Sequence, residues 1–144
     1  MNVRQMLGGR TVADIATISE KEKLSDAVAT LGTRKIGALI VTSADGGVAG
    51  ILSERDIVRR LCADGAKCLD SLVSDTMTAN VVSCSPTDSA QSLLERMTEA
   101  RFRHMTVMEE GALAGVISIG AVVKAHISVI EMWKQAMEDM IKGV

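Results

Sequence analysis

The chain has 144 residues, of which 47% are apolar and 24% charged, and its net charge is −2. This length and composition suit one compact unit or two small halves packed together. The balanced charge and the near absence of aromatic residues exclude the basic face and stacking platforms of a nucleic-acid binder. No signal-peptide pattern begins the chain and no apolar run reaches the roughly 18 residues of a membrane span, so we expect a cytoplasmic protein.

The first half of the chain alternates short extended and helical patterns. A short helical face within residues 1–9 ends at Gly8-Gly9. The predicted elements that follow are an extended piece at 15–19, a helix at 24–33, a strand at 37–42, a turn at 43–47, a return strand at 48–52 and a helix at 54–62. The turn contains Asp45-Gly46, which is a strong hairpin signal.

The second half of the chain has the same order of patterns. The predicted elements are an extended segment at 81–84, a helix opened by Pro86 and Asp88, a strand at 104–108, a turn at 109–111, a return strand at 113–117 and a helix from Ser118. Asp88 and Gln91 form the expected capping pair of the first of these helices. Residues 121–140 predict one long helix, with apolar residues recurring every three or four positions.

The two halves therefore form an internal repeat. Val107 lies 66 residues after Val41, and Gly115 lies 65 residues after Gly50, so the second half lacks one turn residue. A duplication of this length constrains the whole fold, and each half alone has too small a core to be stable. We expect an α+β fold of two β-α-β-β-α repeats, packed with pseudo-twofold symmetry and followed by a C-terminal helix.

The expected division of the chain follows from this repeat. The first repeat with its N-terminal segment occupies residues 1–72, the second repeat occupies residues 73–127, and a helical extension occupies residues 128–144.

Ser53 and Asp56 stand where a predicted strand turns into a helix. Ser-x-x-Asp is close to the capping box Ser-x-x-Glu, which only starts helices. The same corner also suits a nucleotide, because helix N-termini attract phosphate and a carboxylate can accept hydrogen bonds from two ribose hydroxyls. The second half makes this corner with Ser118 but has Ala121 at the position of Asp56. The fold therefore does not require the carboxylate, which favours a ligand role for Asp56.

Two nine-residue segments carry a family resemblance. They are Gly-Ile-Leu-Ser-Glu-Arg-Asp-Ile-Val at 50–58 and Gly-Val-Ile-Ser-Ile-Gly-Ala-Val-Val at 115–123. With the linker at 73–78 and the strand start at 81–86, they resemble a tandem pair of CBS domains, a Bateman module, over about residues 3–127. The resemblance implies a stand-alone, non-catalytic regulatory module that binds an adenosine-containing ligand in clefts between the repeats. AMP is the first candidate, followed by ADP, ATP, NAD and S-adenosylmethionine.

The resemblance also implies which residues form the main cleft. Ser53 and Asp56 come from the first repeat, and Asp56 holds the ribose. The second repeat contributes Val81, Val82, Phe102, Arg103 and His104. In this interpretation the two valines face the base, the Arg103 guanidinium grips phosphate as a fork, and His104 adds a donor. The alternative for Arg103 and His104 is a polar strand edge that faces solvent.

A second cleft would combine Ser118 with residues of the first repeat, and it departs from the family pattern. The first-repeat residues are Ala16, Thr17, Ile36, Gly37 and Ala38. Ala121 replaces the carboxylate and Gly37-Ala38 replaces the basic pair, with Lys35 as a partial substitute. We expect this cleft to be empty, weak or differently selective.

No set of nucleophile, base and orienting residue stands out, so we expect no enzyme. The chain has three unevenly spaced cysteines and two histidines, so we also expect no metal site. Cys84 fits a small core residue, whereas Cys62 and Cys68 flank a turn that favours partial exposure and leaves a redox sensor as a minor alternative.

The expected partners are a second copy of the chain, bound through the repeats and the C-terminal helix, and an unknown regulated protein. The competing function is a ligand-free structural dimerisation module with vestigial clefts.

Overall fold

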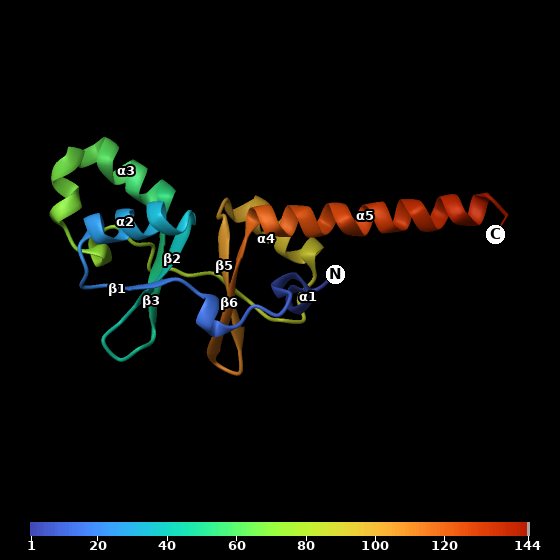
Figure 1. The fold of residues 1–144 in the computed structure, drawn as a ribbon, viewed down its shortest axis with the longest axis horizontal. Coiled ribbons are helices and arrows are strands. Elements are labelled where there is room, and N and C mark those ends of the chain that lie inside the picture. Colours follow the sequence, from blue (N-terminus) through green and yellow to red (C-terminus); the bar gives the residue numbers. More distant parts are fainter. Residues whose placement is uncertain (144) are drawn as a thin grey trace. The chain divides into compact units, whose positions relative to one another are not determined.

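The computed structural model describes residues 1–143, which form two compact units. The repeat-one unit is Asp14–Val81, and the repeat-two unit joins Met1–Ala13 to the chain from Val82 onward. Each unit contains one three-stranded sheet and its own helices (Figure 1), which confirms the predicted α+β fold class. We describe each unit by itself. Within the described residues, no helix has both the length and the apolar character that crossing a bilayer demands.

The repeat-one unit follows the predicted order of elements. They are β1 (Thr17–Ser19), α2 (Leu24–Arg34), β2 (Ala38–Thr42), β3 (Val48–Ser53), α3 (Glu54–Asp64) and the 3₁₀ helices η2 (Gly65–Asp70) and η3 (Val73–Asp75), with η1 (Val12–Asp14) at the boundary between the units. β2 is the central strand, parallel to β1 and antiparallel to β3. The β2–β3 register pairs Ala38 with Ser53, which places the start of β2 beside the corner that begins α3.

The repeat-two unit has the same topology. Its elements are α1 (Val3–Leu7), β4 (Ser83–Cys84), α4 (Ala90–Ala100), β5 (His104–Glu109), β6 (Ala112–Ser118) and α5 (Ile119–Ile141). His104 pairs with Ser118 as Ala38 pairs with Ser53, and both hairpins have a register irregularity at the matching position of the central strand. The duplication seen in the sequence is therefore a duplication of sheet register as well.

The helical spacing of apolar residues explains how each sheet is covered. In the repeat-one unit, α2 buries Leu24, Ala27 and Leu31, which recur at three- and four-residue steps and share one face of the helix. They form one core cluster with residues of both β2 and β3. In the repeat-two unit, α4 buries Leu93 and Met97 in the same way.

The predicted N-cap of α4, Asp88, is wrong by one residue. Ser89 is the N-cap, and its hydroxyl accepts the Ser92 N–H at 3.1 Å. The Asp88 carboxylate is engaged one turn earlier, where it accepts the Ser85 N–H at 2.8 Å. Asp88 therefore closes the turn before the helix, and Ser89 caps the helix itself.

Segments 2–8 and 72–78 occupy equivalent places in opposite units. Each has an isolated β-bridge to the residue before a helix, a valine with no exposed surface and a side chain against a strand glycine. The residues in this order are Asn2, Val3 and Leu7 in one segment, and Leu72, Val73 and Met77 in the other. The first turns differ, because the side chains of Asn2 and Gln5 cap each other, whereas in the other segment only the Asp75 carboxylate accepts the Leu72 N–H, at 3.2 Å. Thr78 therefore corresponds to Gly8.

Candidate functional site

The Ser53–Asp56 corner is a reciprocal capping box. Ser53 ends β3 with extended backbone angles, and its hydroxyl oxygen accepts the Asp56 N–H at 3.3 Å. In return, Asp56 Oδ2 accepts the Ser53 N–H at 3.0 Å and the Ser53 hydroxyl at 3.1 Å. One carboxylate oxygen is therefore engaged in starting α3, as the capping interpretation requires.

The second oxygen of Asp56 has a different partner. Oδ1 accepts a hydrogen bond from the Thr78 hydroxyl at 3.4 Å. The Asp56 side chain is half-buried, whereas Thr78 is exposed. A carboxylate has about four lone-pair sites, and three donors of the described chain meet this one. One acceptor site on Oδ1 remains for a further donor.

The corresponding corner of the repeat-two unit has no carboxylate. Ser118 caps α5 alone, and its hydroxyl accepts the Ala121 N–H at 3.2 Å. The helix that follows is 23 residues long, more than twice the length of α3 with its 11 residues. A serine cap is thus sufficient to start a helix at this corner, and the carboxylate of Asp56 is an addition to it.

In each unit the residue before the central strand contacts this corner through its backbone. Gly37 accepts the Glu54 N–H at 3.0 Å, and Arg103 accepts the Ile119 N–H at 2.8 Å. Gly37 and Ala38 therefore lie at the Ser53 corner of their own unit. Arg103, which is exposed, and His104, which is half-buried, lie at the Ser118 corner of theirs.

The predicted cleft residues are divided between the two units. Ser53, Asp56 and Val81 belong to the repeat-one unit, together with the second-cleft residues Thr17, Ile36, Gly37 and Ala38. Val82, Phe102, Arg103, His104 and Ser118 belong to the repeat-two unit. Phe102 packs against the core of that unit, and the Val82 carbonyl accepts the Thr106 N–H at 3.0 Å. The assembly of these two groups into shared clefts stays a prediction.

Thr78 is the residue at this site that the sequence interpretation missed. It was grouped with the linker to the second repeat, whereas the structure pairs it with Ile51 and places its hydroxyl on Asp56. No local pattern in the sequence indicates this contact, because 22 residues separate Thr78 from Asp56.

The three cysteines differ in their surroundings. Cys62 is exposed, whereas Cys68 and Cys84 are buried. The expected partial exposure of Cys68 is wrong, because η2 folds back so that this thiol joins the core of the repeat-one unit with Leu24 and Val73. Burial raises the pKa of the Cys84 thiol to about 11, and the negative charge of Asp88 acts in the same direction. Cys68 and Cys84 are therefore poor candidates for a redox sensor.

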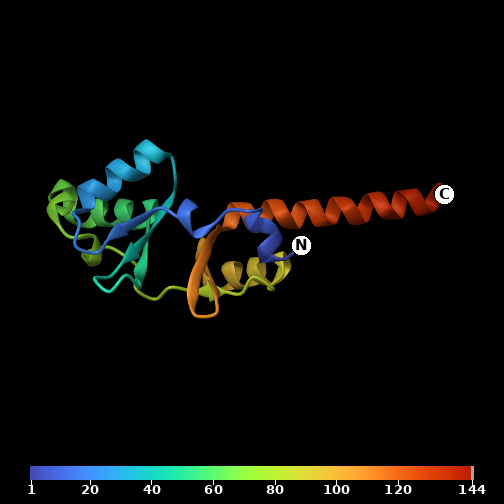
Figure 2. The ribbon, with the colours of Figure 1, turned by 60° about the horizontal axis from the view of Figure 1, so that its bottom comes forward.

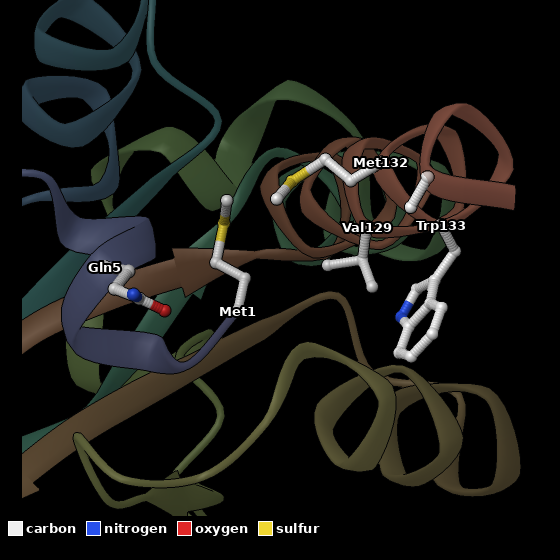
Figure 3. A pocket seen from close by; sticks show the side chains of 6 residues that line it. Met1, Gln5, Val129, Met132 and Trp133 are labelled. Carbon is white, nitrogen blue, oxygen red and sulfur yellow. The ribbon is translucent and has the colours of Figure 1, made fainter. Parts of the chain in front are cut away.

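A groove of about 480 Å³ lies between the N-terminus and α5 in the repeat-two unit (Figure 3). It is lined mainly by apolar side chains: Met1, Gln5, Val129, Met132, Trp133 and Ala136. Trp133 keeps 70% of its surface exposed. Both ribbon views show that α5 continues well past the rest of its unit (Figures 1 and 2).

Comparisons with known proteins agree on one family. The family model described as "CBS domain" matches residues 10–63 and 73–128. The CBS domain-containing protein CBSCBSPB2 of Arabidopsis thaliana is 30% identical over 117 residues, which are 78% of this chain and 22% of that protein. The mitochondrial CBSX3 of the same plant is 30% identical over 122 residues, 82% of this chain and 59% of that protein. This chain thus spans about a fifth to three fifths of these relatives.

Solved structures give the same result. The CBS-domain containing protein ATU1752 from Agrobacterium tumefaciens is 46% identical, with a TM-score of 0.81 over 87% of this chain and 92% of that one. A more distant structure, CBSX2 in complex with AMP, is 20% identical and covers 89% of this chain and 97% of that one, with a TM-score of 0.71. The second likeness concerns the fold alone.

Proposed function

Because the chain belongs to the CBS-domain family and carries two copies of the domain, we propose that it is a regulatory module that binds an adenine nucleotide. Pairs of CBS domains are generally regulatory and bind adenosine ligands. AMP is the first candidate, and the AMP complex of CBSX2 supports it as a ligand that this fold can hold. ATP, ADP and NAD share the ribose and base of AMP and remain in the proposal. We further propose a cytoplasmic location.

One observation carries the proposal: the two corners of the repeat differ by one carboxylate. Ser118 caps α5 without help, whereas α3 has Asp56 in addition to Ser53. Only one oxygen of Asp56 takes part in the capping box, and Oδ1 keeps a lone pair. In our proposal Oδ1 receives a ribose hydroxyl. A hydrogen bond to a charged acceptor contributes about 1.5–3 kcal/mol, which corresponds to a roughly ten- to hundredfold gain in affinity.

The other parts of the nucleotide require residues of the second repeat. We assign the phosphate to Arg103 and His104, because an exposed arginine offers a planar fork that matches two phosphate oxygens. We assign the adenine to the segment of Val81 and Val82. The second cleft, with Ser118 and without a carboxylate, is proposed to bind weakly or to prefer another ligand.

Isothermal titration calorimetry with AMP, ATP and NAD tests the proposal. Asp56→Asn keeps a capping side chain but removes the charge, so we expect AMP affinity to fall about ten- to hundredfold. The matched control is Asp88→Asn, since Asp88 likewise accepts the N–H of the residue three positions earlier. The AMP affinity of Asp88→Asn should equal that of the wild type. The proposed site is contradicted if the wild type binds none of the three nucleotides, or if Asp56→Asn and Asp88→Asn bind AMP equally.

The phosphate assignment has its own test. Arg103→Ala should weaken AMP and ATP, whereas adenosine, which has no phosphate, should bind to this variant and to the wild type equally. Arg59→Ala, which removes an exposed arginine from α3, is the control for net charge. An equal loss for AMP and adenosine would exclude a phosphate contact by Arg103.

We also propose that the module acts as a homodimer that uses α5. The only fully buried residues of α5 are Val122 and Ala125, both in its first third. Farther along, the large side chains that expose half or more of their surfaces are Ile130, Met132, Trp133, Met137, Met140 and Ile141. In proteins most of the stability of a helix comes from packing of its apolar face. A typical stable interface buries about 800 Å² on each partner, and a surface of this size requires several such side chains.

The apolar surface around Trp133, and not the charges of α5, carries the proposed interface. Lys124 lies nine residues before Trp133, which at 3.6 residues per turn places it on the opposite side of the helix. The competing function, a structural dimer without ligand, shares this interface and differs in the calorimetric result.

A further inference from the structure

The segment that leads out of the repeat-one unit is hydrogen-bonded to the Ser53–Asp56 corner. Ile51 and Thr78 form an isolated antiparallel bridge, in which the Thr78 N–H reaches the Ile51 carbonyl at 2.9 Å and the Ile51 N–H reaches the Thr78 carbonyl at 3.0 Å. A Cβ atom at Gly50 would lie 2.5 Å from the Thr78 carbonyl oxygen. The glycine therefore permits a close approach that places the Thr78 side chain at the corner.

The hydrogen bonds of Asp56 leave too few acceptor sites for a complete ribose. The Ser53 N–H and hydroxyl occupy Oδ2, and the Thr78 hydroxyl occupies one site on Oδ1. A ribose with two free hydroxyls adds two donors, so five donors compete for about four lone-pair sites. One of the protein's own bonds must break. The Thr78 bond is the longest of the three at 3.4 Å, and longer hydrogen bonds are weaker.

The other repeat supplies an internal comparison. Segment 2–8 occupies in its unit the place of segment 72–78, and Gly8 stands there where Thr78 stands here. The corner beside it has Ala121 in place of Asp56. The carboxylate and the hydroxyl are thus present together in one unit and absent together in the other. Ser118 alone starts α5 at the corner without the carboxylate, so a helix can begin there without a residue like Asp56.

We propose that Thr78 is a specificity-determining residue of the nucleotide site, because its hydroxyl competes with a ribose hydroxyl for Asp56. This inference rests on the proposed function. It predicts that the wild-type protein gains little from the second ribose hydroxyl, since that bond replaces the bond from Thr78. Without the Thr78 hydroxyl, both ribose hydroxyls find acceptor sites.

The test is a cycle of two proteins and two ligands in calorimetry: wild type and Thr78→Val, each with AMP and with 2′-deoxy-AMP. Valine has the shape of threonine without the hydroxyl. We expect Thr78→Val to bind AMP roughly threefold to tenfold more tightly than the wild type does. Its affinity for 2′-deoxy-AMP should be within about twofold of the wild-type affinity for the same ligand. Discrimination between the two nucleotides therefore increases in the variant.

Two further variants serve as controls. Thr78→Ser retains the hydroxyl and should show wild-type discrimination. Thr76→Val makes the same change in the same segment, at a hydroxyl that is buried and meets no partner in the described structure, and should leave both affinities unchanged. Thermal unfolding of each variant confirms that it is folded.

The outcomes separate the two proposals. If AMP binds to the wild type and Thr78→Val leaves the ratio of the two affinities unchanged, or weakens both ligands equally, the competition is refuted and the nucleotide site stands. If the wild type binds none of AMP, ADP, ATP and NAD, the proposed function fails, and this inference fails with it.

Discussion

Individual side chains in this protein differ in function although they occupy matching positions of a repeat. Ser53 and Ser118 have the same capping role, and only one of the two corners adds a carboxylate. Asp45 is a further example of local chemistry: the Ser43 hydroxyl and the Gly47 N–H both donate to its carboxylate and lower its pKa. This aspartate serves the β2–β3 turn, so a shifted pKa alone does not identify a functional residue.

Cys84 gives a prediction at this scale that depends on pH. Burial raises the pKa of its thiol from 9.0 to about 11 in the folded protein. The neutral thiol is therefore favoured by folding, and its contribution to stability is complete below pH 9 and is lost as the pH rises from 9 through 11. Urea unfolding between pH 8 and pH 11 should show this loss in the wild type.

The comparison for Cys84 uses two variants. In Cys84→Ala the stability is lower throughout because a buried group is removed, but the additional decline above pH 9 disappears. In Cys62→Ala, which alters an exposed thiol, the decline should remain as in the wild type. If the free energy of unfolding declined equally with pH in the wild type and in Cys84→Ala, the decline would not come from the Cys84 thiol.

At the scale of elements, the two strand glycines differ in what lies against them. A Cβ atom at Gly50 meets the backbone oxygen of Thr78 at 2.5 Å, whereas one at Gly115 meets the end of the Leu7 side chain at 2.7 Å. A backbone cannot move aside without losing the Ile51–Thr78 bridge, but a leucine can change rotamer. We expect Gly50→Ala to reduce the free energy of unfolding by about 2–3 kcal/mol, and Gly115→Ala by about 1 kcal/mol.

Urea denaturation of the two glycine variants measures this difference directly. Gly32→Ala is a suitable control, because no atom outside its own stretch of helix lies within 4 Å of the position of its Cβ and alanine favours a helix interior by up to about 1 kcal/mol. It should be neutral or stabilising. Equal losses for Gly50→Ala and Gly115→Ala would show that segment 72–78 yields as readily as a side chain.

At the scale of the whole molecule, α5 predicts self-association. Trp133→Glu places a charge in the exposed apolar surface of the helix, so it should convert a dimer into a monomer in sedimentation at micromolar concentration. Val48→Glu, at another exposed apolar side chain, is the control and should leave the dimer intact. A wild type that sediments as a monomer contradicts the proposed interface.

The sequence by itself determined the repeat, the order of elements, the serine-capped corners and the contrast between Asp56 and Ala121. These features depend on apolar periodicity and on capping residues within a few positions of each other, and such local patterns are legible without coordinates. The start of α4 was misplaced because Ser85 and Ser89 offer competing local bonds on either side of Asp88.

Only the tertiary structure decided which distant residues meet. Segments 2–8 and 72–78 occupy matching places in opposite units, Cys68 turns into the core, and the Thr78 hydroxyl reaches a carboxylate 22 residues earlier in the chain. Contacts of this kind depend on how the sheets and helices pack, because no local pattern encodes which segment covers a given strand. The carboxylate of Asp56 at a helix start was therefore visible in the sequence, whereas the Thr78 hydroxyl that donates to it became visible only in the fold.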